Sequence, residues 1–216
     1  MGTAVMILGK SGVGKSASMR NLPDNIYSVV EVDGKPLPFR GKKKAFNTDD
    51  YKRITQIMHT TPTDIIVIDD SQYLMANEFM RRSRESGYNK YTEIGVNFWN
   101  LINEVQKLPE SKIVYFMHHS EDDGLGGIKE KTIGRMLDEK ICIVGMFSIV
   151  LVADKTDKDY IFRTQNDGRS PAKTPIGMFE QKVIDNDLQV VDSTIREYYE
   201  MPEATKVEVK TNDDNK

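Results

Sequence analysis

Cysteine, histidine and tryptophan are scarce in this chain of 216 residues, which has one, three and one of them, respectively. The single cysteine, Cys142, has no partner for an internal disulfide bond, and its apolar run 141–144 is typical of a packed core thiol. No Cys/His spacing typical of a metal site occurs. These absences exclude a disulfide-stapled scaffold and a zinc-binding module.

Long apolar runs and an excess of basic residues are absent as well. No run approaches the roughly 20 residues that a membrane-spanning helix needs, and the short amino-terminal run lacks the basic leader of a secretion signal. We therefore expect a cytoplasmic protein that does not contact a membrane. The net charge of −3 excludes a wholly basic nucleic-acid coat, so any DNA contact would come from local patches.

The strongest positive signal is the stretch Gly9–Ser16, which follows an apolar run and reads G-x-x-x-x-G-K-S. This Walker A pattern predicts a strand, a phosphate-binding loop and a helix that begins near Lys15. Its glycines bring backbone N–H groups close to an anion, Lys15 reaches the β- and γ-phosphate oxygens, and Ser16 offers its hydroxyl to Mg²⁺. The predicted contacts to ATP are Gly9, Lys10, Ser11, Gly12, Val13, Gly14, Lys15, Ser16 and Ala17.

A second signal is the apolar run 65–68, which is typical of a central buried strand and ends in two acids, Asp69 and Asp70. This Walker B pattern assigns Asp69 to magnesium and makes Asp70 a candidate general base. Glu31 and Asp33, at the end of the predicted second strand, compete for the role of base. Asp70 also suits the N-cap of the following helix, and the two roles are compatible.

Two further groups of polar residues are candidates for the reaction. His118 or His119, at the end of the predicted strand 111–120, would sense the γ-phosphate, although a structural, hydrogen-bonded histidine explains either residue equally well. Arg169 or Lys173, in the turn-rich loop 166–175, would reach the ATP site of a neighbouring subunit as a cationic finger. A plain surface turn is the alternative for that loop.

Three basic segments are candidate contacts to single-stranded DNA, namely 35–44, 81–91 and 129–135. The second mixes arginines with tyrosines, as single-strand binders do. Each segment also suits a solvated surface, because charge runs usually face water. The glycine-rich loop 121–128 is expected to be mobile and to become ordered on DNA.

The pattern as a whole predicts an α/β fold with a mainly parallel sheet, flanking helices and an antiparallel hairpin formed by 146–153 and 159–164. Helices are predicted at 15–22, 50–59, 72–82, 92–108 and 193–199. Residues 1–201 are expected to form one domain, and the polar tail 202–216 is expected to be disordered.

The chain resembles the RecA-like single-strand annealing proteins of the Sak-type phage recombination systems. The resemblance rests on 9–16 with 19–22, on the Lys-Pro-Leu-Pro-Phe stretch at 35–39, on 65–70, on 133–138, and on 173–175 with 177–179. It implies a RecA-like P-loop NTPase core, ATP and Mg²⁺ binding, single-stranded DNA binding, strand annealing, and assembly into a ring or filament. It also implies phage or host replication and recombination proteins as partners, in the cytoplasm of the host cell.

Two other functions share the phosphate loop. A nucleotide or small-molecule kinase normally has an arginine-bearing lid, whereas the candidate lid here, 121–128, is acidic and rich in glycine. A nucleotide-gated adaptor, such as a helicase loader, has less need of the two acids at 69–70. We therefore favour a weak Mg²⁺-dependent ATPase that binds single-stranded DNA.

Overall fold

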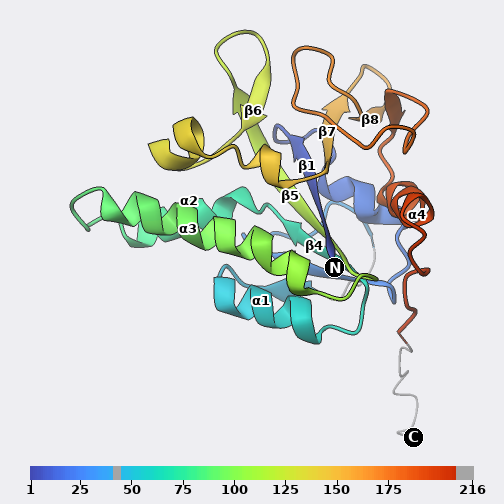
Figure 1. The fold of residues 1–216 in the computed structure, drawn as a ribbon, viewed down its shortest axis with the longest axis horizontal. Helices are drawn as coiled ribbons and strands as arrows, with labels where there is room; N and C mark the ends of the chain where they lie inside the picture. The colour runs from blue at the N-terminus through green and yellow to red at the C-terminus, as the bar shows by residue number, and fades with distance from the viewer. Residues whose placement is uncertain (41–44, 208–216) are drawn as a thin grey trace, which may run out of the picture.

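The computed structural model describes residues 1–40 and 45–207 as a mixed α/β protein built on one central sheet (Figure 1). Its strands are β1 (Thr3–Gly9), β2 (Tyr27–Glu31), β3 (Ala45–Asn47), β4 (Ile65–Asp69), β5 (Ile113–Asp122), β6 (Ile128–Glu130), β7 (Ile149–Lys155), β8 (Tyr160–Arg163) and β9 (Val183–Asp185). Its longer helices are α1 (Tyr51–Thr60), α2 (Gln72–Arg81), α3 (Asn89–Glu104) and α4 (Leu188–Tyr198). Short helical turns are η1 (Ser16–Asn21), η2 (Val105–Lys107), η3 (Met136–Lys140) and η4 (Val144–Met146).

The sheet runs in the order β3-β2-β4-β5-β1-β7-β8-β9, and β6 pairs with β5 outside this path. In sheet order, the six strands β3-β2-β4-β5-β1-β7 are parallel to their neighbours. Strands β8 and β9 continue the sheet with antiparallel pairing. Strands β1 and β4 are apolar along nearly their whole length, and β5 is apolar over its first half, because both faces of a parallel sheet are covered. The predicted mainly parallel sheet, its flanking helices and its antiparallel hairpin toward the carboxyl terminus are confirmed.

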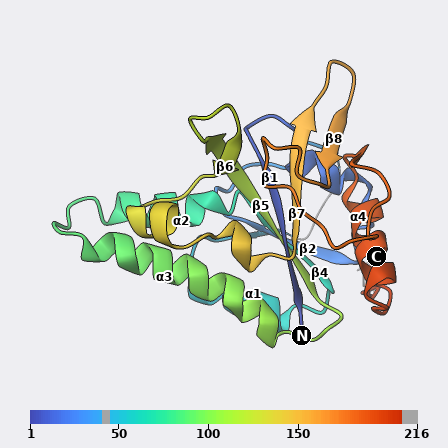
Figure 2. The same cartoon turned by 45° about the horizontal axis from the view of Figure 1, so that its top comes forward.

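Alternate residues of each strand enter two hydrophobic cores. Helices α1, α2 and α3 cover one face, where Ile54, Leu74 and Phe98 pack on the sheet. On the other face, η1 and α4 pack through residues that include Met19 and Val191. Figures 1 and 2 show α4 on the side opposite to α3. No helix within the described ranges is long and apolar enough to cross a membrane.

Several elements differ from the sequence-based expectation. The helix predicted at 15–22 is a 3-10 helix of six residues, Ser16–Asn21. Helix α4 begins at Leu188, five residues earlier than predicted, because Asp187 caps it by accepting a hydrogen bond from the Gln189 backbone. The strands β3, β6 and β9 were not predicted, since three residues are too few to show a period.

The carboxyl-terminal segment 202–207 is bound to the body of the protein, so the expected disorder is wrong for these residues. Arg196 donates to the Pro202 carbonyl at 3.0 Å, and the Thr205 N–H donates to the Asp64 carboxylate at 2.8 Å. The Val207 N–H donates to the Asn25 carbonyl at 2.9 Å. The remainder of the predicted tail, 208–216, lies outside the described residues.

Candidate functional site

A pocket of about 660 Å³ opens at the carboxyl ends of the parallel strands, where ligands of such sheets bind. The loop after β1 forms its floor, and the loops after β2, β4 and β5 form one wall. Tyr160 of β8 stands on the other side. The residues that line the whole pocket are Ser11, Gly12, Gly14, Lys15, Ser16, Ala17, Lys35, Pro38, Asp70, Gln72, Tyr73, His119, Ser120, Lys131 and Tyr160.

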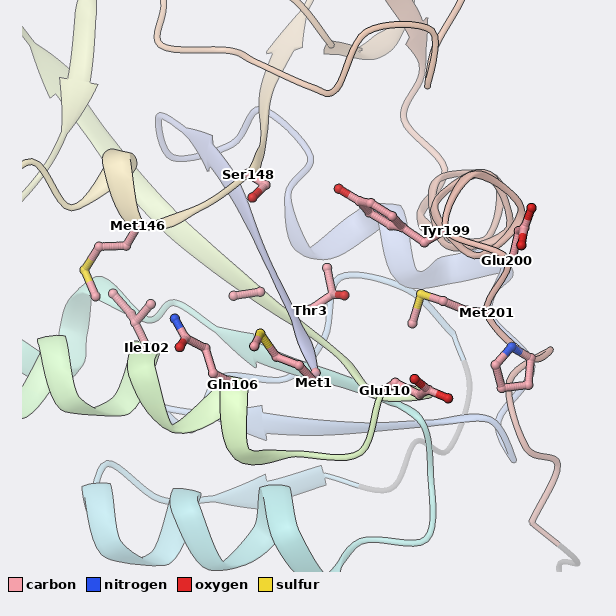
Figure 3. Close-up of a pocket in the computed structure, with 13 residues that line it drawn as sticks. Met1, Thr3, Ile102, Gln106, Glu110, Met146, Ser148, Tyr199, Glu200 and Met201 are labelled. Carbon is pink, nitrogen blue, oxygen red and sulfur yellow. The ribbon is translucent and has the colours of Figure 1, made fainter.

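A second pocket, of about 400 Å³, lies at the opposite edge of the sheet (Figure 3). Met1, Ile102 and Met146 line one part of it, and Tyr199 and Met201 line another. Polar residues such as Gln106, Glu110 and Glu200 line it as well, but its lining includes none of the residues 9–16 and 69–70 that the sequence assigns to ATP and Mg²⁺. The carboxyl-edge pocket is therefore the candidate functional site.

The floor of the candidate site depends on glycine. Gly12 and Gly14 have φ angles of 80° and 90°, a left-handed backbone that residues with a Cβ rarely adopt. A Cβ on Gly14 would also lie 2.7 Å from Cδ1 of Tyr160, and one on Gly9 would lie 2.8 Å from the Ala153 carbonyl oxygen. The loop thus has the curvature predicted from the Walker A pattern.

Lys15 lies beneath this loop with only 5% of its surface exposed. Its ammonium donates to the carbonyl oxygens of Gly9, at 2.9 Å, and Lys10, at 3.0 Å. Burial lowers the pKa of Lys15 to about 8, although the carboxylates of Asp69 and Asp70 act in the opposite direction. A bound anion would favour the charged form of Lys15, which burial disfavours.

Ser16 and Asp69 meet across the sheet, with the Ser16 hydroxyl donating to Asp69 Oδ1 at 2.9 Å. Strand β5 lies between β1 and β4, so this contact reaches past one intervening strand. Burial raises the pKa of Asp69 to about 6, against the opposing effect of the Ser16 hydrogen bond. One hydroxyl and one carboxylate fit Mg²⁺, which takes most of its remaining ligands from water and phosphate. Among the described residues, no group of three or more His, Cys, Asp or Glu side chains that could hold a metal ion is found.

Asp70 lies between the side chains of His119 and Lys35. Its Oδ1 lies 2.9 Å from His119 Nε2, and its Oδ2 lies 3.5 Å from Lys35 Nζ. Burial raises the pKa of Asp70, but the His119 hydrogen bond and the nearby positive charges outweigh this effect, so that its pKa lies below the ordinary value. The φ angle of 56° is rare for a residue with a side chain and marks a constrained position. The capping position of α2 belongs to Ser71, so the N-cap expectation for Asp70 is wrong.

Glu31, the competing acid, pairs in register with Asp69 on the neighbouring strand, so the two side chains share one face of the sheet. Burial raises the pKa of Glu31. Unlike Asp70, Glu31 is not among the lining residues of the pocket. Asp33 lies 2.6 Å from Lys35 and acts as its ion-pair partner.

The two neighbouring histidines point to opposite faces of β5. His118 is fully buried, lies 3.0 Å from the Ser71 hydroxyl and 2.9 Å from the Lys131 carbonyl, and has its pKa lowered to about 4 by burial. Its ring cannot contact a ligand in the pocket, which corrects the prediction of His118 as a phosphate sensor. His119 lines the pocket in its place.

Arg169 and Lys173 lie outside the candidate pocket of their own chain. Exposed Arg169 lines a neighbouring hollow of about 410 Å³, which also includes Gly9, Lys10 and Val13 of the glycine loop. The backbone of Lys173 forms an isolated bridge with Val150. A role for either side chain in another subunit's site stays a prediction.

The basic segments differ in how their charges are used. Arg82 contacts three carboxylates, those of Glu78, Glu85 and Glu93. Arg81 is paired with Asp49, and Lys90 is buried and donates to backbone carbonyls. Residues 41–44 of the first segment lie outside the described residues. In the third segment, Lys131 lines the pocket and the Arg135 side chain is 91% exposed.

Lys35, Tyr73, Lys131 and Tyr160 line the pocket but were not predicted as site residues. Lys35 had a detectable signal, because it follows the turn at Gly34 just after a predicted strand. Tyr160 had none, since its position depends on how β8 packs beside the glycine loop. No known protein-family model matches the chain, and a search of curated proteins finds no significant match.

Proposed function

We propose that this chain is a Mg²⁺-dependent ATP-binding protein with a RecA-like P-loop core, which hydrolyses ATP weakly and binds single-stranded DNA in phage recombination and strand annealing. The observation that supports it best is the convergence of buried Lys15 and the Ser16–Asp69 pair on one glycine loop. A turn that matched the Walker A pattern by chance would not need a buried ammonium and a distant acid at the same place.

Different groups of the site would bind the phosphates and the magnesium ion. Backbone N–H groups of the glycine loop surround the β-phosphate, and Lys15 exchanges its two carbonyl partners for phosphate oxygens. Ser16 and Asp69 would hold Mg²⁺, which would neutralise charge on the phosphates. With both bound, ATP offers a γ-phosphate that is open to attack by water.

We propose Glu31 as the general base, from the direction of its pKa and its register with Asp69, although Asp70 and not Glu31 lines the pocket. A general base works best when its pKa is near the working pH, and burial moves the pKa of Glu31 upward. The pKa of Asp70 is moved downward, and His119 and Lys35 engage its oxygens. Asp70 would instead hold the side chains of His119 and Lys35 toward the γ-phosphate.

The proposed DNA contact is the basic segment 129–135, which follows the acidic loop of the β5–β6 hairpin. Strand β5 runs from His119 in the pocket into this hairpin, and Lys10 of the glycine loop lies 2.7 Å from Asp122, the residue of β5 next to the hairpin loop. Lys131 lines the pocket directly after β6. A DNA strand that orders the hairpin would therefore act on the nucleotide site through contiguous contacts. Assembly into a ring or filament belongs to the same proposal.

The test is binding of fluorescent single-stranded DNA by anisotropy, with and without ATP and Mg²⁺, across a salt series. We expect binding that needs nucleotide, weakens with salt and is lost in Lys15→Ala, since nucleotide and DNA binding are coupled. Isothermal titration of ATP into both proteins serves as the control for the nucleotide site. ATP binding without DNA binding under any condition would overturn the recombination function and favour a kinase or an adaptor.

A further inference from the structure

Tyr160 holds an unusual place for an exposed aromatic residue. Its ring lies against the glycine loop so closely that Gly14 has no room for a Cβ. The residue is nonetheless 42% exposed and lines the candidate pocket. The exposed Lys155 lies over the ring with its Nζ 5.2 Å from the centroid, so a flexible, cationic group already approaches the ring face.

The sheet order gives the pocket a direction. The glycine loop follows β1, with β5 and β4 on one side and β7 and β8 on the other. Asp69 and Asp70 end β4, and His119 is on β5, so every acid and sensor of the proposed reaction lies on one side of the loop. Metal ions in such sites bridge the β- and γ-phosphates. The terminal phosphate therefore belongs on the β4–β5 side.

A nucleoside is attached to the opposite end of the phosphate chain. If the γ-phosphate lies beside Asp70, the α-phosphate lies near the residues that follow Lys15, and the nucleoside extends toward β7 and β8. On that side Ala17 and Tyr160 line the pocket. The ring thus stands where the sugar and base leave the phosphate loop.

We propose that the nucleobase stacks on the ring of Tyr160. The base would displace the Lys155 side chain, which lies over that ring in the structure. This inference rests on the proposed function, because it assumes that the glycine loop binds the phosphates. Stacking is tolerant of base identity, since every base has a π-face. The site consequently accepts purine and pyrimidine triphosphates, with purines preferred for their larger rings.

The experiment compares binding of ATP, CTP and inorganic tripolyphosphate, each with Mg²⁺, by isothermal titration calorimetry on the full chain. Tripolyphosphate carries the phosphate contacts without a nucleoside. We expect Tyr160→Leu, which keeps apolar packing against Gly14, to weaken ATP binding roughly 5- to 100-fold and to leave tripolyphosphate binding unchanged. The matched control Tyr160→Phe keeps the ring and should bind all three ligands like the wild type.

The outcomes separate this inference from the proposal on which it rests. Unchanged ATP affinity in Tyr160→Leu overturns the stacking role. An equal loss of ATP and tripolyphosphate also overturns it, because Tyr160 then acts only by supporting the glycine loop. If wild-type protein binds neither ligand, the phosphate site itself is wrong. If wild type binds tripolyphosphate as tightly as ATP, the phosphate site stands and the nucleoside platform falls.

Discussion

At the scale of single residues, the site shows how the environment of a carboxylate decides its role. Asp69, Asp70 and Glu31 lie at the ends of two paired strands, yet burial raises the pKa of Asp69 and Glu31, whereas the cation donors around Asp70 lower its pKa. Sequence patterns name all three acids but do not rank them. The ranking depends on partners that lie up to 53 positions away, as Ser16 does from Asp69, and His119 lies 49 positions from Asp70.

The first prediction concerns these acids. Glu31→Gln should bind ATP with unchanged affinity and lose at least about 100-fold in hydrolysis rate, because a general base typically contributes 10²–10⁴-fold. Asp70→Asn should retain measurable hydrolysis, since it only loosens His119 and Lys35. Single-turnover phosphate release and titration of ATP measure the two quantities. If Asp70→Asn is inactive and Glu31→Gln is not, Asp70 is the base.

At the scale of elements, the sequence predicts those whose periodicity is long and whose ends carry a signal. Strand β4 is a continuous apolar run, and α1 has both an apolar face and a capping Asp50 that accepts from the Arg53 N–H. The 3-10 form of η1 leaves no such signal, and strand alternation places His118 and His119 on opposite faces without indicating which of them faces the pocket. They depend on tertiary packing, which a single sequence does not display.

The carboxyl-terminal segment illustrates the same limit, because its polar composition hides its anchors. Asp64 accepts from the Thr205 N–H at 2.8 Å and from the Ser111 hydroxyl at 2.8 Å. Burial raises the pKa of Asp64, but these hydrogen bonds outweigh it and lower the pKa overall. Arg196, which is also bound to Asp192 at 2.6 Å, reaches Pro202. Backbone groups of the segment thus contact the Arg196 side chain of α4 and the Asp64 side chain just before β4.

The second prediction is that this segment stabilises the fold. A chain that ends at Met201 should lose about 1–3 kcal/mol in the free energy of unfolding, because it removes the partners of Asp64 and Arg196 and leaves both groups partly unsatisfied. A chain that ends at Val207 keeps the contacts described above and is the matched control. Urea denaturation followed by circular dichroism measures both. Equal stability of the two truncated chains would restore the expectation of a disordered tail.

At the scale of the whole molecule, charge has to be local to serve DNA binding. The chain has a net charge of −3, so its average field repels a polyanion. Of the candidate basic segments, 81–91 has Arg81 and Arg82 committed to carboxylates. The segment 129–135 lies nearer the pocket, and the ion pairs of Lys129 with Glu121 and of Arg135 with Glu139 are longer, at 3.4 Å and 3.8 Å. We therefore place the DNA contact there.

The last prediction tests this placement with charge reversals. Lys129→Glu combined with Arg135→Glu should lower nucleotide-dependent affinity for single-stranded DNA and reduce the slope of log K against log salt by roughly 1.4, about 0.7 for each lost phosphate contact. Lys107→Glu combined with Lys206→Glu changes the net charge equally, at exposed positions away from the pocket, and is the control. Anisotropy titrations at several salt concentrations measure the slope. If both pairs reduce affinity alike, DNA responds to net charge alone and the segment 129–135 is not its contact.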